Sequence, residues 1–62
     1  MGPVEQISED RRKEIFAAIV EAQDGKTDVA RSRQIVAFRF GLNETQIEQI
    51  ELQGIESDWP PL

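Results

Sequence analysis

The first run of hydrophobic residues in the chain repeats with the period of an α-helix. Apolar side chains recur at spacings of three and four residues, as on the buried face of a helix packed against a core. The stripe consists of Ile15, Phe16, Ile19, Val20 and Ala22. Ser8 precedes it and is a favourable N-cap, because its hydroxyl can accept a hydrogen bond from a free backbone N–H. We predict a helix from about Glu9 to Gln23, ended by Gly25 in a left-handed conformation.

A second helix is predicted to begin at Thr27 or Asp28 and to run to Phe40, where Gly41 ends it. Its apolar face is expected to comprise Val29, Ser32, Val36 and Phe40, widened by Ile35 and Phe38. Unlike the first helix, this segment is rich in basic residues between its apolar positions.

A third helix is predicted to begin after Asn43, a favourable N-cap, with Gln46 at the spacing needed to hydrogen-bond back to the cap backbone. Its apolar side is expected to carry Ile47 and Ile50, together with Leu52, which is either exposed or packed. Gly54 is expected to end this helix.

The remaining segments are predicted to lie outside the helices. Residues 1–7 form an extended N-terminal segment, and residues 55–62 form a tail, because Trp59 precedes two prolines that resist helical backbone angles. We expect Trp59 and Leu62 to fold back and enlarge a thin core. Strict alternation of apolar and polar residues, the sign of a strand, does not occur. The predicted fold is therefore all-α: three helices over residues 8–54, with an extended Trp-Pro-Pro tail packed on them.

The connection between the second and third helices is short enough to hold them at a steep angle, as in a helix-turn-helix. Counted from Arg33, such a unit requires small or apolar residues and a glycine, and all seven positions comply: Val36, Ala37, Phe40, Gly41, Leu42, Ile47 and Ile50. Ala37 must be small where the helices approach, and Gly41 accommodates a positive φ. The residues then left on the outside of the third helix are Glu44, Thr45, Glu48, Gln49 and Leu52.

The stretch Arg39-Phe40-Gly41-Leu42-Asn43 followed by Ile47-Glu48-Gln49-Ile50-Glu51 resembles region 4 of bacterial sigma factors, with its glycine turn and Val-Arg-Gln-Ile-Glu sequence. The resemblance covers about residues 27–54. In that family the helix-turn-helix reads the −35 promoter element, so the resemblance implies a transcription-related module that binds DNA or acts beside RNA polymerase. Where the family presents arginines from the third helix, this chain has Glu44, Gln46 and Glu48. The DNA-binding residues that the resemblance implies are Asn43, Thr45, Gln46 and Gln49, with Arg31, Arg33 and Arg39 reaching phosphates from the second helix.

The charge of the chain opens a second hypothesis. Seven basic residues against twelve acidic ones give a net charge of −5. The basic residues gather at positions 26–42, with four bases and one acid, whereas positions 43–62 hold five acids and no base. Because acidic surfaces repel phosphates, one such module would bind DNA weakly. The alternative is a protein–protein interaction module that applies the acidic third helix to a basic partner.

The composition argues against an enzyme. The chain lacks cysteine and histidine, which removes disulfides, thiolate chemistry, most zinc sites and the usual general base. Glu44, Glu48 and Glu51 lie at helical spacing, but no nucleophile accompanies them, so we predict no catalytic site, cofactor, metal or small-molecule substrate. No apolar run approaches the roughly 18 residues of a membrane span, and the N-terminus lacks a signal-peptide pattern. We therefore expect a cytoplasmic location without membrane contact.

Overall fold

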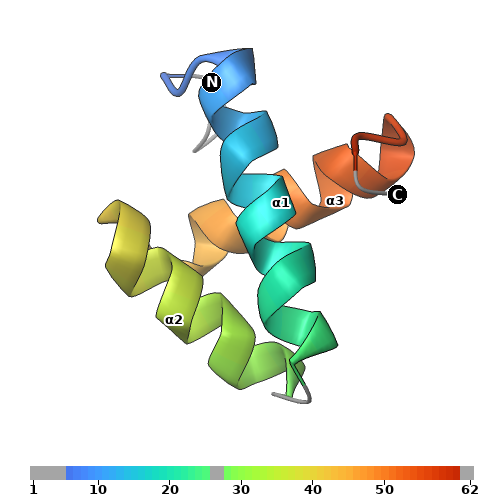
Figure 1. The fold of residues 1–62 in the computed structure, drawn as a ribbon. Helices are drawn as coiled ribbons and strands as arrows, with labels where there is room; N and C mark the ends of the chain where they lie inside the picture. The colour runs from blue at the N-terminus through green and yellow to red at the C-terminus, as the bar shows by residue number, and fades with distance from the viewer. Residues whose placement is uncertain (1–5, 26–27, 61–62) are drawn as a thin grey trace.

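Three helices make up the regular structure of residues 6–25 and 28–60, the part of the chain that the computed structural model describes. Helix α1 spans Glu9–Asp24, α2 spans Val29–Phe40, and α3 spans Glu44–Glu56. In Figure 1, α1 and α2 converge toward the loop that joins them, and α3 passes behind α1. The predicted all-α, three-helix fold is thereby confirmed. None of the described helices has the length and apolar character needed to cross a bilayer.

The start of α1 is as predicted, but its end differs. The Ser8 hydroxyl accepts a hydrogen bond from the backbone N–H of Arg11 at 3.2 Å, as expected of an N-cap. Gly25 has φ −80°, so the prediction of a left-handed residue is wrong. Its N–H donates to the carbonyl of Ala22 at 3.4 Å. Gly25 thus continues the right-handed backbone conformation of the helix in a tight turn. A residue with a side chain can adopt the same conformation, so this position does not require glycine.

The core lies where the three helices meet. Its buried apolar residues are Ile15, Phe16, Ile19, Val36, Ala37, Ile47, Ile50 and Trp59. Ser32 is also fully buried, and its hydroxyl donates a hydrogen bond to the carbonyl of Val29 at 2.8 Å, so this polar group is not left unpaired in the core. The stripe predicted for α1 is confirmed, since Val20 and Ala22 pack against the core at its edge.

The apolar face predicted for α2 is wrong in part. Val29 and Ile35 are about half exposed, at 48% and 47%, and Phe38 is 91% exposed. The reason is geometric: α2 buries a narrow stripe that includes Val36 and Ala37, and each residue turns the helix by about 100°. A stripe that buries Val36 and Ala37 points Phe38 away from the core.

The turn between α2 and α3 is fixed by backbone hydrogen bonds. Gly41 has φ +70°, confirming the predicted positive φ. The N–H of Leu42 donates to the carbonyl of Ala37 at 2.8 Å, and the N–H of Gly41 donates to the carbonyl of Phe38 at 3.4 Å. This pair of bonds is a Schellman motif, which ends a helix and redirects the chain. It produces the abrupt change of direction of a helix-turn-helix.

The capping box predicted at the start of α3 is present in both directions. The Asn43 side chain accepts from the backbone N–H of Gln46 at 2.8 Å, and the Gln46 side chain accepts from the backbone N–H of Asn43 at 3.0 Å. Two backbone donors at the helix start are thus satisfied, which fixes where α3 begins relative to the turn.

Gly54 does not end α3, contrary to the prediction, because the helix continues to Glu56. Gly54 is buried, and a Cβ placed on it would overlap the ring of Phe16. The glycine therefore serves close packing between α1 and α3 rather than chain reversal. The predicted tail of residues 55–62 accordingly begins inside the helix.

The chain after α3 is turned by a second Schellman motif, which positions Trp59. Asp58 has φ +53°, its N–H donates to the carbonyl of Ile55 at 3.4 Å, and the N–H of Trp59 donates to the carbonyl of Gly54 at 3.0 Å. Trp59 is 6% exposed and meets the Phe16 ring edge-on, with centroids 6.2 Å apart. Of the remaining predictions for the chain ends, those on residues 1–5, Pro61 and Leu62 lie outside the described residues.

Gly54→Ala should destabilise the protein, although alanine is the better helix former by about 1 kcal/mol. The added methyl would have to displace the buried Phe16 ring, at a cost of about 2 kcal/mol or more. Thermal unfolding followed by circular dichroism measures the effect. The control is Gly25→Ala, whose Cβ would make only ordinary contacts at 3.5 Å or more, so its stability should change by less than about 0.5 kcal/mol. Equal effects of the two substitutions would contradict the proposed close packing.

Asp58→Gly should raise the stability by about 1 kcal/mol, because glycine adopts the left-handed conformation of this position without strain. For a domain of this size that corresponds to an increase in melting temperature of about 4–8 °C. The adjacent substitution Ser57→Gly is the matched control. Ser57 has an ordinary φ of −99°, so glycine there should lower the melting temperature. A lower melting temperature for Asp58→Gly would show that the positive φ is not what this position requires.

Candidate interaction face of the helix-turn-helix

One side of α3 is exposed along its whole length, and we call this side the α3 face. It comprises Glu44, Thr45, Glu48, Gln49, Leu52, Ile55 and Glu56. The first five are the residues that the sequence placed outside, and that prediction is confirmed. Ile47 and Ile50 are fully buried on the opposite side and hold α3 in this orientation. Because α3 contains no lysine or arginine, its own charges on this face are all negative.

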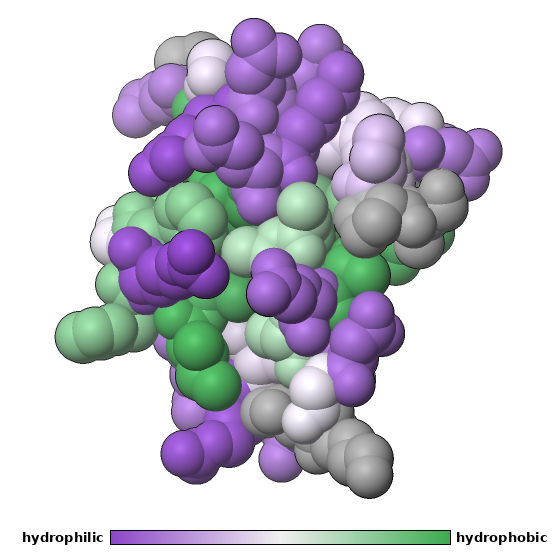
Figure 2. Space-filling view, viewed as in Figure 1, coloured by the Kyte–Doolittle hydropathy of each residue, from purple (hydrophilic) through white to green (hydrophobic). Residues whose placement is uncertain are grey.

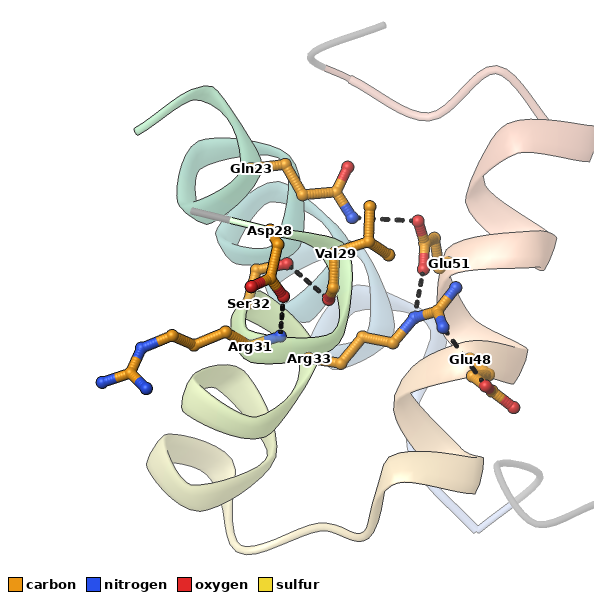
Figure 3. A network of polar contacts seen from close by, with 8 residues as sticks. All are labelled: Gln23, Asp28, Val29, Arg31, Ser32, Arg33, Glu48 and Glu51. Atoms are coloured by element: carbon orange, nitrogen blue, oxygen red, sulfur yellow. Dashed lines mark hydrogen bonds and ion pairs between the residues drawn. The ribbon is translucent and has the colours of Figure 1, made fainter. Parts of the chain in front are cut away.

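The Arg33 side chain of α2 is turned toward two carboxylates of α3. The Nε of Arg33 donates to Glu51 at 3.0 Å, and its Nη1 donates to Glu48 at 3.2 Å (Figure 3). The Arg33 side chain is 29% exposed and that of Glu51 is 14% exposed, so the pair is partly shielded from water. Arg33 thus bridges α2 and α3.

The network of Arg33 extends to the first helix. Glu51 uses its other carboxylate oxygen to accept a hydrogen bond from the side chain of Gln23 at 3.0 Å. Figure 3 shows Glu51 between Gln23 of α1 and Arg33 of α2. One carboxylate therefore ties all three helices together, and a further bond outside this network, from Arg12 to Gln53 at 2.8 Å, joins α1 to α3.

An open groove of about 310 Å³ lies beside this network. Its lining combines the charged groups with the apolar end of the α3 face: Arg33, Glu48, Gln49, Glu51, Leu52 and Ile55. Leu52 and Ile55 are 52% and 53% exposed. The lining thus sets two half-exposed apolar side chains beside carboxylates, which attract cations and repel phosphates.

The other two arginines predicted to contact DNA lie on α2 away from this network. The guanidinium of Arg31 points away from Glu48 and Glu51 in Figure 3, and its backbone N–H donates to the Asp28 side chain at 2.8 Å. Arg39 is exposed, with its guanidinium 5.7 Å from the centroid of the Phe40 ring. The structure therefore separates the three predicted arginines, with only Arg33 beside α3.

The four predicted polar residues of the third helix also fall into two groups. Asn43 and Gln46 use their side chains to form the capping box, so both have a structural role. Thr45 and Gln49 are exposed on the α3 face, where they directly follow Glu44 and Glu48.

Gln23, Glu51 and Ile55 were not among the residues predicted from the sequence to form a site. The sequence shows that Arg33 and Glu51 have opposite charges, but 18 residues separate them. Their pairing could not be predicted because only the steep turn between α2 and α3 brings them together. Ile55 was assigned to the tail because Gly54 was expected to end the helix. In residues 6–25 and 28–60, no three acidic side chains gather closely enough to hold a metal ion.

Comparison of the chain with protein-family models, with curated proteins and with solved structures found no match. The resemblance to sigma factor region 4 therefore stays a prediction from the quoted residues.

The Arg33–Glu51 pair should contribute measurably to stability. A double-mutant cycle with Arg33→Ala and Glu51→Ala is expected to give a coupling free energy of about 1 kcal/mol, because the pair is partly buried and joins two helices. The Arg11–Glu14 pair on α1 is the control, since its side chains are 53% and 64% exposed. Its coupling should stay below about 0.5 kcal/mol. Urea unfolding measures both cycles, and equal coupling in the two would contradict the bridging role of Arg33.

Proposed function

We propose that this domain is a protein–protein interaction module that binds a basic, partly apolar partner surface through the α3 face. The observation that carries the proposal is the make-up of that face: exposed carboxylates beside exposed Leu52 and Ile55, with no basic residue in the helix. Carboxylates attract lysine and arginine, and the apolar pair supplies the water-excluding contact that a specific interface needs.

The position of Arg33 strengthens the case against phosphate binding at this face. An arginine that approached a phosphate there would have to leave Glu48 and Glu51, which would then face the phosphate unpaired. The loss of these contacts and the repulsion would both weaken DNA binding. A basic protein side chain, in contrast, adds a positive charge to a site that already holds two carboxylates around one arginine.

DNA binding is the second candidate, and the helix-turn-helix itself favours it. The short turn at Gly41 sets α3 across α2 in the manner of a recognition helix. Thr45 and Gln49 are exposed on α3, and Arg31 and Arg39 are exposed on α2. In this mode the protein would act as the sigma-like, transcription-related module that the sequence resemblance implies, with RNA polymerase as a further partner.

Titrations followed by amide NMR shifts separate the two candidates. The probes are a helical peptide with arginines on one side and leucines on the other, a scrambled peptide of the same composition, and random and promoter-like DNA duplexes of about 20 base pairs at about 50 mM salt. We expect the amphipathic peptide to shift amides of residues 44–56. The scrambled peptide should bind about tenfold more weakly, since only the ordered pattern presents its leucines to Leu52 and Ile55.

Charge reversal provides the matched control for this titration. Glu48→Lys should weaken binding of the amphipathic peptide about tenfold, whereas Glu21→Lys, an exposed site on α1, should leave it nearly unchanged. Salt-sensitive shifts at residues 31–39 and 43–49 with the duplexes, and none with the peptide, would instead establish DNA binding.

A further inference from the structure

The outward side of α2 has a character opposite to that of the α3 face. We call it the α2 face, and it comprises Arg31, Ile35, Phe38 and Arg39. Ile35 follows Arg31 by four residues, and Phe38 and Arg39 follow Ile35 by three and four, so the four residues share one side of the helix. Phe38 is 91% exposed, which is costly for a large aromatic side chain in water. Figure 2 shows hydrophobic surface spreading over the region of α2, below the hydrophilic N-terminal part of α1.

The two faces match each other in pattern. The α2 face places two arginines around an apolar pair, and the α3 face places Glu44, Glu48 and Glu56 around Leu52 and Ile55. An interface between them would set opposite charges at the rim and apolar groups at the centre, the arrangement typical of specific protein contacts.

The two faces point in different directions, so the α2 face and the α3 face of one molecule cannot contact each other. Arg33 lies on the side of α2 that meets Glu48 and Glu51 of α3. Phe38 follows Arg33 by five residues, which places it about 140° farther around the helix. The α2 face is therefore directed away from α3 of its own chain.

We propose that the partner of the α3 face is the α2 face of a second copy of this chain. The contact is head-to-tail. This inference rests on the proposed function, since it identifies the basic surface that the α3 face binds. Pairing of two identical faces is disfavoured, because it would set arginines against arginines or carboxylates against carboxylates. Since such an assembly keeps one unused α2 face at one end and one unused α3 face at the other, further copies can add to it, and the contact builds open chains rather than closed dimers.

The experiment measures the mass of the full chain by light scattering and by sedimentation equilibrium, over rising protein concentration at low and high salt. We expect the average mass to rise beyond that of a dimer at low salt and to fall as salt screens the charged rim. Phe38→Asp should disable the α2 face and Leu52→Lys the α3 face, each raising the dissociation constant about tenfold or more. Both side chains are exposed, so circular dichroism should show unchanged helix content.

Mixing the two variants tests the head-to-tail arrangement directly. Phe38→Asp retains an intact α3 face and Leu52→Lys an intact α2 face, so the mixture should form a one-to-one dimer and nothing larger. The matched control is Ala30→Asp, which adds the same charge to an exposed position of α2 outside the α2 face and should assemble like the unaltered chain. A mixture that stays monomeric, or an unaltered chain that stops at a dimer, would overturn the proposal.

Failure of this inference can be told apart from failure of the proposed function. If the unaltered chain stays monomeric at millimolar concentration but still binds the amphipathic basic peptide, the second copy is the wrong partner and the α3 face remains a protein-binding surface. If neither self-association nor peptide binding occurs, both proposals are wrong.

Discussion

The contact between the Phe16 ring and the bare backbone of Gly54 is the constraint on which the rest of this structure depends. It lets α1 approach α3 more closely than a side chain at position 54 would allow. The same ring packs edge-on against Trp59, which the turn at Asp58 brings back from the end of α3. A chain of 62 residues without disulfides has little apolar area to bury. This close approach makes one small cluster serve as the core for all three helices.

Local signals in the sequence were sufficient for most of the fold. Ser8 and the Asn43–Gln46 capping box start their helices as predicted, because a cap depends on residues within one helical turn. Gly41 behaves as predicted for the same reason. The errors concern glycine and apolar residues whose role is set by distant partners. Gly54 was read as a helix end, yet it serves packing against Phe16, a residue 38 positions earlier in the chain.

The candidate site was predictable only in its outline. The outward residues of α3 followed from the positions of Ile47 and Ile50, since a helix that buries one side must expose the other. The exposure of Phe38 could not be predicted from the sequence, because its hydrophobicity alone predicts burial. Which part of a wide apolar stripe reaches the core is decided by how the helices are oriented relative to one another. The bridge from Arg33 to Glu51 likewise depends on the angle between α2 and α3. That angle cannot be predicted from the spacing of residues in the sequence.

The bridge at Arg33 links the stability of the helix-turn-helix to the proposed function. The arginine that holds α2 against α3 is also paired with Glu48 of the α3 face, and Glu51 is its second carboxylate partner. A phosphate would have to compete with bonds that stabilise the fold, whereas a basic partner would join an arrangement of excess negative charge without breaking them. On this ground we propose that the same residues favour protein partners over nucleic acids. Arg31 points away from Glu48 and Glu51, and Arg39 lies beside the Phe40 ring. The fold therefore separates its charges into two surfaces instead of combining them into one phosphate-binding surface.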